Sequence, residues 1–316
     1  MKKKLFLLAL FPLMMSSLTG CSKKADFNIG ILQWVNIEAL TKATNGFKKA
    51  FQAAAGNKTV SFEVKNAYGE SSAGSSIINT FVSKNKDLIM GNATPSVILA
   101  ATATDTIPVV GTSVTTYEGA FNGTIPANVT GTSDLADLAE QAKMVFDWVP
   151  TATKVGILYC TNESNSKYQS DMIQVELRKL KSNVAIEEIK FADTNELSQQ
   201  LSAKVNSLDV LYIPTDNTCA DNAEAIHNIC QPANLPVIAG EEGICRSCGL
   251  ASLTIDYYRL GEITGRMAAK ILIEGKKPSE LPIEYDTDTT KVYNPAILTE
   301  LGLSESDVPT GYVALA

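Results

Sequence analysis

The chain has 316 residues, of which 45% are apolar and 19% charged, a composition typical of a globular protein and not of a disordered or fibrous one. Its 34 acidic and 27 basic residues give a formal charge of −7, so the chain would repel a phosphate backbone and we expect no nucleic-acid partner. The single histidine, His227, excludes an HExxH zinc site and argues against Ser-His-Asp or Cys-His catalysis.

The amino terminus has the pattern of an export signal. Three lysines, Lys2 to Lys4, precede an apolar stretch at residues 5–15, which is too short for the roughly 20 residues that a membrane-spanning helix needs. The following Leu18-Thr19-Gly20-Cys21 resembles the lipobox of bacterial lipoproteins. We therefore predict a signal peptide at residues 1–20, acylation (palmitate) of Cys21, and a tether at 21–26 on the extracytoplasmic face of the cell membrane. An uncleaved anchor with a chance cysteine is the alternative.

The remaining cysteines lie in the second half of the chain: Cys160, Cys219, Cys230, Cys245 and Cys248. An extracytoplasmic compartment favours structural disulfides, and plain buried thiols fit equally. A zinc site or a redox pair at Cys245 and Cys248 is the alternative, but the separation of Cys219 and Cys230 fits no common zinc module. The odd number leaves at least one free thiol, and we expect no metal and no cofactor.

The first half of the chain alternates strands and helices. Apolar runs predict strands at residues 29–35, 60–64, 87–90 and 107–110, and amphipathic stretches predict helices at 38–53, 71–82 and 95–103. Strands separated by helices of this length are typical of βαβ units, so we expect a parallel sheet covered on both faces.

The pattern then restarts. We predict helices at residues 135–148, 165–180, 195–205 and 219–231, with strands at 155–159, 186–191, 210–213 and 237–239. Further strands at 251–255 and 281–285 and helices at 258–274 and 295–301 follow, and these are surplus to a simple duplication. The chain should therefore cross between the two halves more than once.

Corresponding strands of the two halves are similar in sequence. Residues 29–32 match 155–158, 107–110 match 235–238, and the strand at residue 87 matches that at 209, with offsets of 126, 128 and 122 residues. Three matches in order predict a duplicated α/β lobe, with chance likeness of apolar strands as the alternative.

Polar residues follow these strands, and ligands of open parallel sheets bind beyond the carboxyl ends of the strands. Two facing lobes would form a cleft for a small polar molecule, with Trp34 supplying a flat apolar surface unless it packs in the core. Thr94-Pro95-Ser96 begins a helix whose free N–H groups suit a carboxylate, although helix capping alone explains it as well.

Asp216 and Asp256 each follow a strand and could receive an ammonium group or cap the next helix. Glu241 and Glu242 are adjacent on the chain and point to opposite faces, which argues against paired carboxylates of a glycosidase. The glycines at 261 and 265 lie within a helical pattern and indicate close packing instead of a phosphate loop.

Eight ordered motifs then resemble a known family. They are residues 29–35, 92–96, 129–134, 155–159, 164–166, 214–217, 240–243 and 255–261. Together the motifs are similar to those of the substrate-binding lipoproteins of tryptophan/tyrosine-type ABC importers, over essentially the whole mature chain. The resemblance implies an α/β fold of two Rossmann-like lobes, the type I periplasmic-binding-protein architecture, joined by a three-segment hinge.

The resemblance also implies an organisation and a function. The first lobe should comprise residues 27–131 plus 254–280 and the second 132–253 plus 281–316, with crossings near 131–133, 252–254 and 281–283. The protein should not be an enzyme, but a monomer that closes on an aromatic amino acid and delivers it to a cognate ABC permease. The ligand-binding set would be Gln33, Trp34, Ala93, Thr94, Pro95, Ser96, Ser133, Asn165, Ser166, Thr215, Asp216, Asn217, Glu242, Asp256 and Tyr257. A surface adhesin or a ligand-sensing lipoprotein on the same fold is the alternative.

Overall fold

The computed structural model describes residues 25–315. The predicted signal peptide, Cys21 and most of the tether lie outside the described residues. Within the described part of the chain, no helix has both the length and the hydropathy that crossing a membrane requires.

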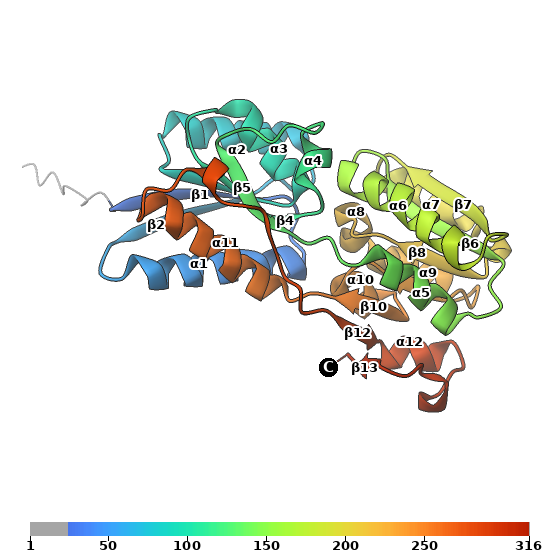
Figure 1. Cartoon of the computed structure of the whole chain (residues 1–316). Helices are drawn as coiled ribbons and strands as arrows, with labels where there is room; N and C mark the ends of the chain where they lie inside the picture. Colours follow the sequence, from blue (N-terminus) through green and yellow to red (C-terminus); the bar gives the residue numbers. More distant parts are fainter. Residues whose placement is uncertain (1–24, 316) are drawn as a thin grey trace, which may run out of the picture.

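The first lobe is a six-stranded sheet of parallel strands in the order β11-β5-β4-β3-β1-β2 (Figure 1). Helices α1 and α11 cover one face and α2 and α3 cover the other. The strands are β1 (Phe27–Gln33), β2 (Val60–Asn66), β3 (Leu88–Asn92), β4 (Val109–Val114), β5 (Val129–Ser133) and β11 (Glu284–Tyr285). The helices are α1 (Glu38–Ala55), α2 (Ser71–Ser83), α3 (Thr94–Ala103), α4 (Tyr117–Ala120) and α11 (Tyr257–Leu272), with a 3-10 turn at Pro278–Glu280.

The second lobe is a seven-stranded sheet in the order β13-β12-β10-β9-β8-β6-β7, in which only the β10–β12 pair is antiparallel. The strands are β6 (Lys154–Cys160), β7 (Ala185–Phe191), β8 (Val210–Ile213), β9 (Val237–Ala239), β10 (Ala251–Thr254), β12 (Thr290–Tyr293) and β13 (Val313–Ala314). The helices are α5 (Leu138–Trp148), α6 (Ser164–Leu180), α7 (Thr194–Ser202), α8 (Asn217–Asp221), α9 (Ala223–Cys230), α10 (Glu242–Ser247) and α12 (Pro295–Glu300), with 3-10 turns at Val205–Ser207 and Glu305–Asp307.

The two sheets share one topology. Strands β2-β1-β3-β4-β5 and β7-β6-β8-β9-β10 follow the same order, the second strand of each unit lying outside the first. The predicted duplication of an α/β lobe is therefore confirmed, and each lobe has its topological switch point beside its first strand, between β1 and β3 or between β6 and β8.

Three segments connect the lobes: the chain crosses after β5, between β10 and α11, and between β11 and β12. The last crossing differs from expectation, because Glu284 and Tyr285 pair with β5 of the first sheet. The chain therefore returns to the second lobe after Tyr285, and not near residues 281–283. The sequence pattern also missed β5, whose residues VTGTS carry few apolar side chains, and it joined α8 and α9 into one helix.

Helices α1 and α11 pack with their backbones in contact. Leu40, Phe47 and Phe51 recur at helical spacing on the buried face of α1. A Cβ added at Gly46 would overlap the carbonyl oxygen of Tyr258, and one at Gly261 would overlap that of Ala43. The interpretation of the α11 glycines as packing residues is confirmed, and the close approach makes the two helices one rigid unit of the first lobe.

The five cysteines within the described residues are free and buried in the second lobe. They contribute to the core beneath α7, α8, α9 and α10. Of the two structural possibilities, plain buried thiols are therefore observed and disulfides are not. The described residues contain no cluster of three or more His, Cys, Asp or Glu side chains arranged to hold a metal ion.

We predict that Gly261→Ala destabilises the protein. The added methyl group meets backbone atoms of α1 that cannot move aside alone, and overpacking of this kind costs about 1–3 kcal/mol. Each kcal/mol should lower the melting temperature by roughly 2–4 °C, which a thermal melt followed by circular dichroism measures. Asn45→Ala, on the exposed side of α1, is the control. A Gly261→Ala protein that melts with the wild type would contradict the tight α1–α11 contact.

Candidate functional site

The carboxyl ends of the two sheets face each other across the seam between the lobes. On the first side the segments that follow β1 and β4 border the seam, and the start of α3, which follows β3, lies at the same sheet edge; on the second side are the segments that follow β6, β8 and β9. The crossings after β5 and before α11 close the seam from behind, where the Tyr257 hydroxyl donates a hydrogen bond to Asp134. The sequence expectation that polar strand ends meet between two lobes therefore describes the structure.

A small enclosed cavity lies at the centre of this seam. Its volume is about 20 Å³, which is close to the space that one water molecule needs. The cavity is bounded by apolar side chains of α1, by hydroxyl and amide groups, and by three carboxylates. Its walls are formed by Ile37, Ala39, Leu40, Ser113, Thr115, Asp134, Asn165, Thr215, Asp216, Asn217, Ala220, Glu241 and Tyr257.

Asp134 is the carboxylate on the hinge side. It is 5% exposed and accepts hydrogen bonds from the hydroxyls of Thr115, at 3.3 Å, and Tyr257, at 3.1 Å. Burial raises the pKa of Asp134 to about 6, and the two hydroxyl donors offset only part of that effect. The charged form of Asp134 is therefore costly in this site unless a cation lies beside it.

Asp216 is the carboxylate at the end of β8. Its two oxygens accept the backbone N–H groups of Cys160 and Cys219, each at 2.8 Å, so it caps α8 and ties that helix to β6. Burial raises the pKa of Asp216, and the neighbouring carboxylate of Glu163 adds to the effect. Helix capping was the alternative role considered for Asp216. The structure shows that Asp216 caps α8 and also lines the cavity.

Glu241 is the carboxylate that follows β9, and it is not among the binding residues expected from the sequence. It caps α10 by accepting the backbone N–H groups of Gly243 and Ile244. Burial raises the pKa of Glu241 to about 7. None of the described residues around the cavity is basic, so three buried carboxylates share a space that contains no countercharge. Such a space favours a cationic group.

The first lobe contributes hydroxyl groups and a helix amino terminus instead of carboxylates. The hydroxyl oxygens of Thr94 and Ser96, in the first turn of α3, are buried without a hydrogen-bond partner, as is that of Ser113 at the end of β4. Ala93 and Ser113 have φ angles of +83° and +56°, which cost free energy for residues that are not glycine. A helix amino terminus with orphaned hydroxyls and locally strained backbone favours an anionic group.

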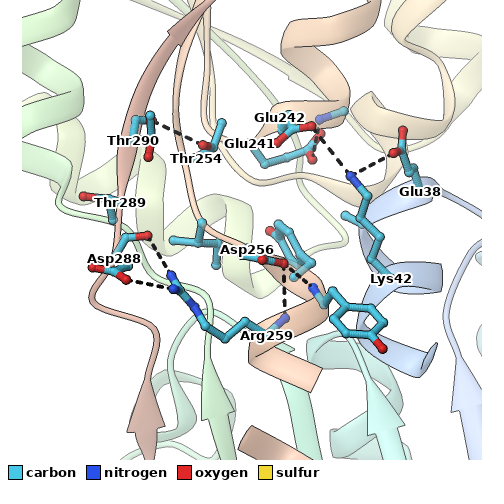
Figure 2. Close-up of a pocket in the computed structure, with 15 residues that line it drawn as sticks. Glu38, Lys42, Glu241, Glu242, Thr254, Asp256, Arg259, Asp288, Thr289 and Thr290 are labelled. Carbon is cyan, nitrogen blue, oxygen red and sulfur yellow. Dashed lines mark hydrogen bonds and ion pairs between the residues drawn. The ribbon is translucent and has the colours of Figure 1, made fainter. Parts of the chain in front are cut away.

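A larger charged cleft of about 690 Å³ opens beside the cavity, between α1, α10 and the crossings (Figure 2). Ala39, Glu241 and Tyr257 border both spaces. Glu242 and Asp256 line this outer cleft but not the enclosed cavity. Asp256 caps α11 through the backbone N–H groups of Tyr258 and Arg259, so its observed role is the capping alternative.

The predicted residues thus separate into three groups. Five of them meet at the enclosed cavity: Asn165, Thr215, Asp216, Asn217 and Tyr257. Four form the start of α3 at the same sheet edge: Ala93, Thr94, Pro95 and Ser96. The other six are Gln33, Trp34, Ser133, Ser166, Glu242 and Asp256, and neither these six nor the four residues of the α3 start border the enclosed cavity.

Trp34 and Gln33 are engaged within the first lobe. Trp34 is 6% exposed and packs in the core beneath α2, although one edge borders a groove of about 520 Å³ between the lobes. The side chain of Gln33 hydrogen-bonds to Val35, Thr41 and Thr44. Core packing of Trp34, the alternative considered above, is thus what the structure shows.

Sequence reasoning missed Ser113, Thr115, Asp134 and Glu241 as cavity residues. Asp134 and Glu241 lay within the quoted motifs at 129–134 and 240–243, so the motifs carried the signal. The position of Ser113 depends on an irregularity of β4 between Gly111 and Val114, which no sequence pattern reveals.

The lobes lie closed upon each other. The side-chain amide of Gln169, on α6, donates to the Thr115 hydroxyl of the first lobe at 3.2 Å. Lys42 on α1 pairs with Glu242 on α10 at 3.6 Å. These contacts cross the seam, so the cavity is shut by the approach of two lobes and not by one flexible loop.

Comparisons with known proteins agree with this architecture. Residues 28–308 match the family model of the ABC transporter substrate binding proteins. The chain is 34% identical to a tyrosine-binding protein of Clostridioides difficile, over 96% of this chain and 93% of that protein. A Streptococcus pneumoniae structure in complex with L-Trp is 28% identical, with a TM-score of 0.83 over 91% of this chain and all of that one.

A ligand-free, open structure of a substrate-binding protein with adhesive properties from Clostridium difficile is 34% identical. It covers 92% of this chain and all of its own, with a TM-score of 0.68. The higher TM-score belongs to the L-Trp complex although its sequence identity is lower. The structure of this chain is thus more similar to the L-Trp complex than to the open, ligand-free structure, in agreement with the contacts that hold its lobes closed.

We predict that the ligand-free protein loses stability as the pH rises from about 4 to 7. The pKa values of Asp134 and Glu241, about 6 and 7, lie above those of the unfolded chain, about 4, so the folded state keeps protons that the unfolded state has released. Their stabilising contribution is complete below pH 4 and is lost as the pH passes through 6 to 7.

Asp134→Asn removes one of these groups. Between pH 5 and pH 8 the variant should lose about 1 kcal/mol less stability than the wild type, since roughly one pH unit separates 5 from the pKa of Asp134. Urea denaturation at the two pH values measures the difference. Asp137→Asn, at an exposed helix cap, is the control. Equal pH dependence in Asp134→Asn and wild type would show that Asp134 does not titrate in this range.

Proposed function

The chain belongs to the family of ABC transporter substrate-binding proteins, and we propose that it captures an aromatic amino acid for delivery to a membrane permease. Its fold is that of the type I periplasmic-binding proteins. The observation that carries the proposal is the cavity at the seam, whose walls include carboxylates of the second lobe and the hinge and the hydroxyls of Ser113 and Thr115 of the first lobe. The start of α3, with its unpartnered hydroxyls, lies at the same edge of the first sheet.

This arrangement suits a zwitterion. The α-ammonium group would lie among Asp134, Asp216 and Glu241, where it supplies the missing positive charge. The α-carboxylate would meet Thr94, Ser96 and the backbone N–H groups that begin α3. Because these two ends of the ligand contact different lobes, bound ligand would favour the closed arrangement over the open one.

The lobes must open before a ligand can enter and close again after it has bound. A cavity of about 20 Å³ holds one water and not an amino acid, so the lobes have to separate before a ligand enters. The three crossings provide the hinge, and the direct contacts between Gln169 and Thr115 must break during opening. The lobes would then re-close around the ligand with a larger space between them.

An aromatic side chain is the best candidate for the remainder of the ligand. Ile37, Leu40 and Tyr257 give the cavity an apolar wall on the side of the first lobe. The two relatives named for their ligands are a tyrosine-binding protein and an L-Trp complex. Burying a benzyl-sized group contributes roughly 2–3 kcal/mol, and an aromatic contact adds about 0.5–1.5 kcal/mol.

We infer that the protein acts outside the cell, because its amino terminus has the pattern of an export signal. We propose that Cys21 carries the acyl groups that anchor the mature chain to the extracytoplasmic face of the membrane. Cells fed an alkyne-tagged fatty acid should label the wild-type protein and leave Cys21→Ser unlabelled. Wild-type protein without label would exclude the anchor while leaving the binding site unaffected.

The adhesin alternative rests on one relative. The structure from Clostridium difficile is described as a substrate-binding protein with adhesive properties. The built cavity between the lobes favours ligand capture as the activity of this chain, since adhesion alone would not require buried carboxylates at a hinge seam.

Among the twenty amino acids, Tyr, Phe and Trp should raise the melting temperature most in a thermal-shift panel. Calorimetry should show leucine binding at least tenfold more weakly, because it fills less of the site and offers no aromatic face. A larger shift with leucine or with a sugar would exclude the aromatic assignment, although the fold and the binding role would stand.

The same titration tests the ammonium site. Asp216→Asn should weaken binding more than tenfold, because removing one partner of a buried charge pair costs about 2–5 kcal/mol and each factor of ten is 1.4 kcal/mol. Asp256→Asn, at a helix cap outside the cavity, is the matched control and should bind within a factor of about three of the wild type.

A further inference from the structure

Two short charge patterns face each other at the mouth of the seam. Helix α1 begins with Glu38 and carries Lys42 one turn later, and their side chains form an ion pair of 2.8 Å. Helix α10 begins with Glu242 and carries Arg246 one turn later, with an ion pair of 2.7 Å. Each helix thus presents one acid and one base at i and i+4 spacing.

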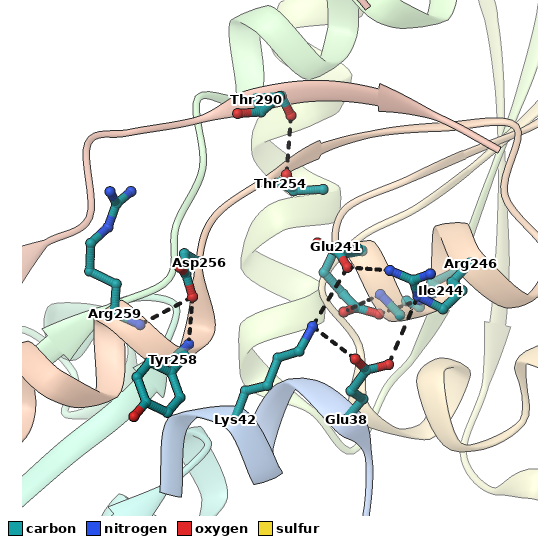
Figure 3. Close-up of polar contacts among 12 residues, drawn as sticks. Glu38, Lys42, Glu241, Ile244, Arg246, Thr254, Asp256, Tyr258, Arg259 and Thr290 are labelled. Atoms are coloured by element: carbon teal, nitrogen blue, oxygen red, sulfur yellow. Dashed lines mark hydrogen bonds and ion pairs between the residues drawn. The ribbon is translucent and has the colours of Figure 1, made fainter. Parts of the chain in front are cut away.

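The two patterns complement each other across the lobes; Glu38, Lys42 and Arg246 are labelled in Figure 3, and Glu242 is labelled in Figure 2. Lys42 of the first lobe lies 3.6 Å from Glu242 of the second, and Arg246 of the second lobe lies 3.9 Å from Glu38 of the first. The four charges therefore alternate in sign around a ring, with two contacts inside the helices and two contacts between the lobes.

The ring lies next to the walls of the enclosed cavity. Ala39 follows Glu38 on the chain, Glu241 precedes Glu242, and both Ala39 and Glu241 border that cavity. The same two residues border the outer clefts of about 690 Å³ and 240 Å³ on the two sides of the ring. The charged ring thus stands where the two lobes separate when the cavity opens.

We propose that Glu38, Lys42, Glu242 and Arg246 form an electrostatic latch that favours the closed state and so sets ligand affinity without touching the ligand. The statement about affinity rests on the proposed function, and the statement about closure does not. When the lobes part, each helix keeps its own ion pair, so opening leaves no charge unpaired. The latch can therefore be released repeatedly at small cost.

The strength of the latch should depend on salt. The four side chains are between 27% and 53% exposed, and contacts between exposed charges are weak and are screened by ions. We expect its contribution to affinity to be about three- to tenfold in 50 mM salt and to fall towards unity in 0.5 M salt.

Exchanging the acid and the base within one helix tests the contacts between the lobes without removing the ion pair that stabilises the helix. The pair E38K/K42E retains an ion pair within α1 and the net charge, but it brings like charges together at both contacts between the lobes. Its affinity for L-tyrosine, measured by calorimetry, should fall at least threefold in 50 mM salt and recover as salt rises. The combination with E242R/R246E restores attraction across the seam and should return the affinity to within a factor of two of the wild type.

Small-angle X-ray scattering of the ligand-free proteins tests closure without any ligand. At 50 mM salt the first double variant should have a larger radius of gyration than the wild type, and the quadruple variant should match the wild type. If the radius and its salt dependence are the same in all three proteins, the latch does not exist. If the wild type binds no amino acid but the scattering differences appear, the proposed ligand is wrong and the latch stands.

Discussion

Three carboxylates are held out of water at the seam between two lobes, and the residues that line their cavity in the described part of the chain supply no positive charge. Most of the local structure follows from the need to satisfy these groups. Asp216 and Glu241 accept backbone N–H groups at the starts of α8 and α10, and Asp134 accepts hydroxyls of Thr115 and Tyr257. The same bonds that fix the carboxylates therefore fix the helix ends, the hinge and the polarity of the cavity. A site built in this way is rigid within each lobe and adjustable only between the lobes.

The scaffold that holds this seam was largely predictable, because its signals are local. Apolar runs fixed the central strands, and helical spacing of Leu40, Phe47 and Phe51 fixed α1. The duplication could be recognised from matching strands, since both sheets repeat one strand order. Strand β5 escaped notice because its pairing with β4 is a tertiary property of a polar segment. The third crossing was misplaced for a similar reason, since two residues of β11 join the first sheet through pairing alone.

The site was predictable in kind more than in detail. Strand-end rules found Asn165, Thr215 and Asp216, because the ends of parallel strands always meet at one edge. They overestimated Trp34, whose position after β1 does not reveal that its ring turns into the core. They passed over Glu241, because a shift of one position along the chain decides which of two adjacent glutamates reaches the enclosed cavity. Glu241 borders both that cavity and the outer cleft, whereas Glu242 borders only the outer cleft. Such alternatives are decided by helix capping and by packing between lobes, neither of which is written in a short motif.

The placement of the cysteines divides the molecule chemically as well as structurally. The described first lobe contains no cysteine, whereas the second lobe buries five thiols in one core, where burial raises the thiol pKa of each. A protonated thiol within a core reacts slowly with alkylating reagents, so modification requires that this core open first. Among the described residues, thiol alkylation therefore reports on the second lobe alone and can separate the unfolding of this lobe from that of the first lobe. The five free thiols therefore provide a chemical probe of one lobe, because all of them lie in the core of the described second lobe.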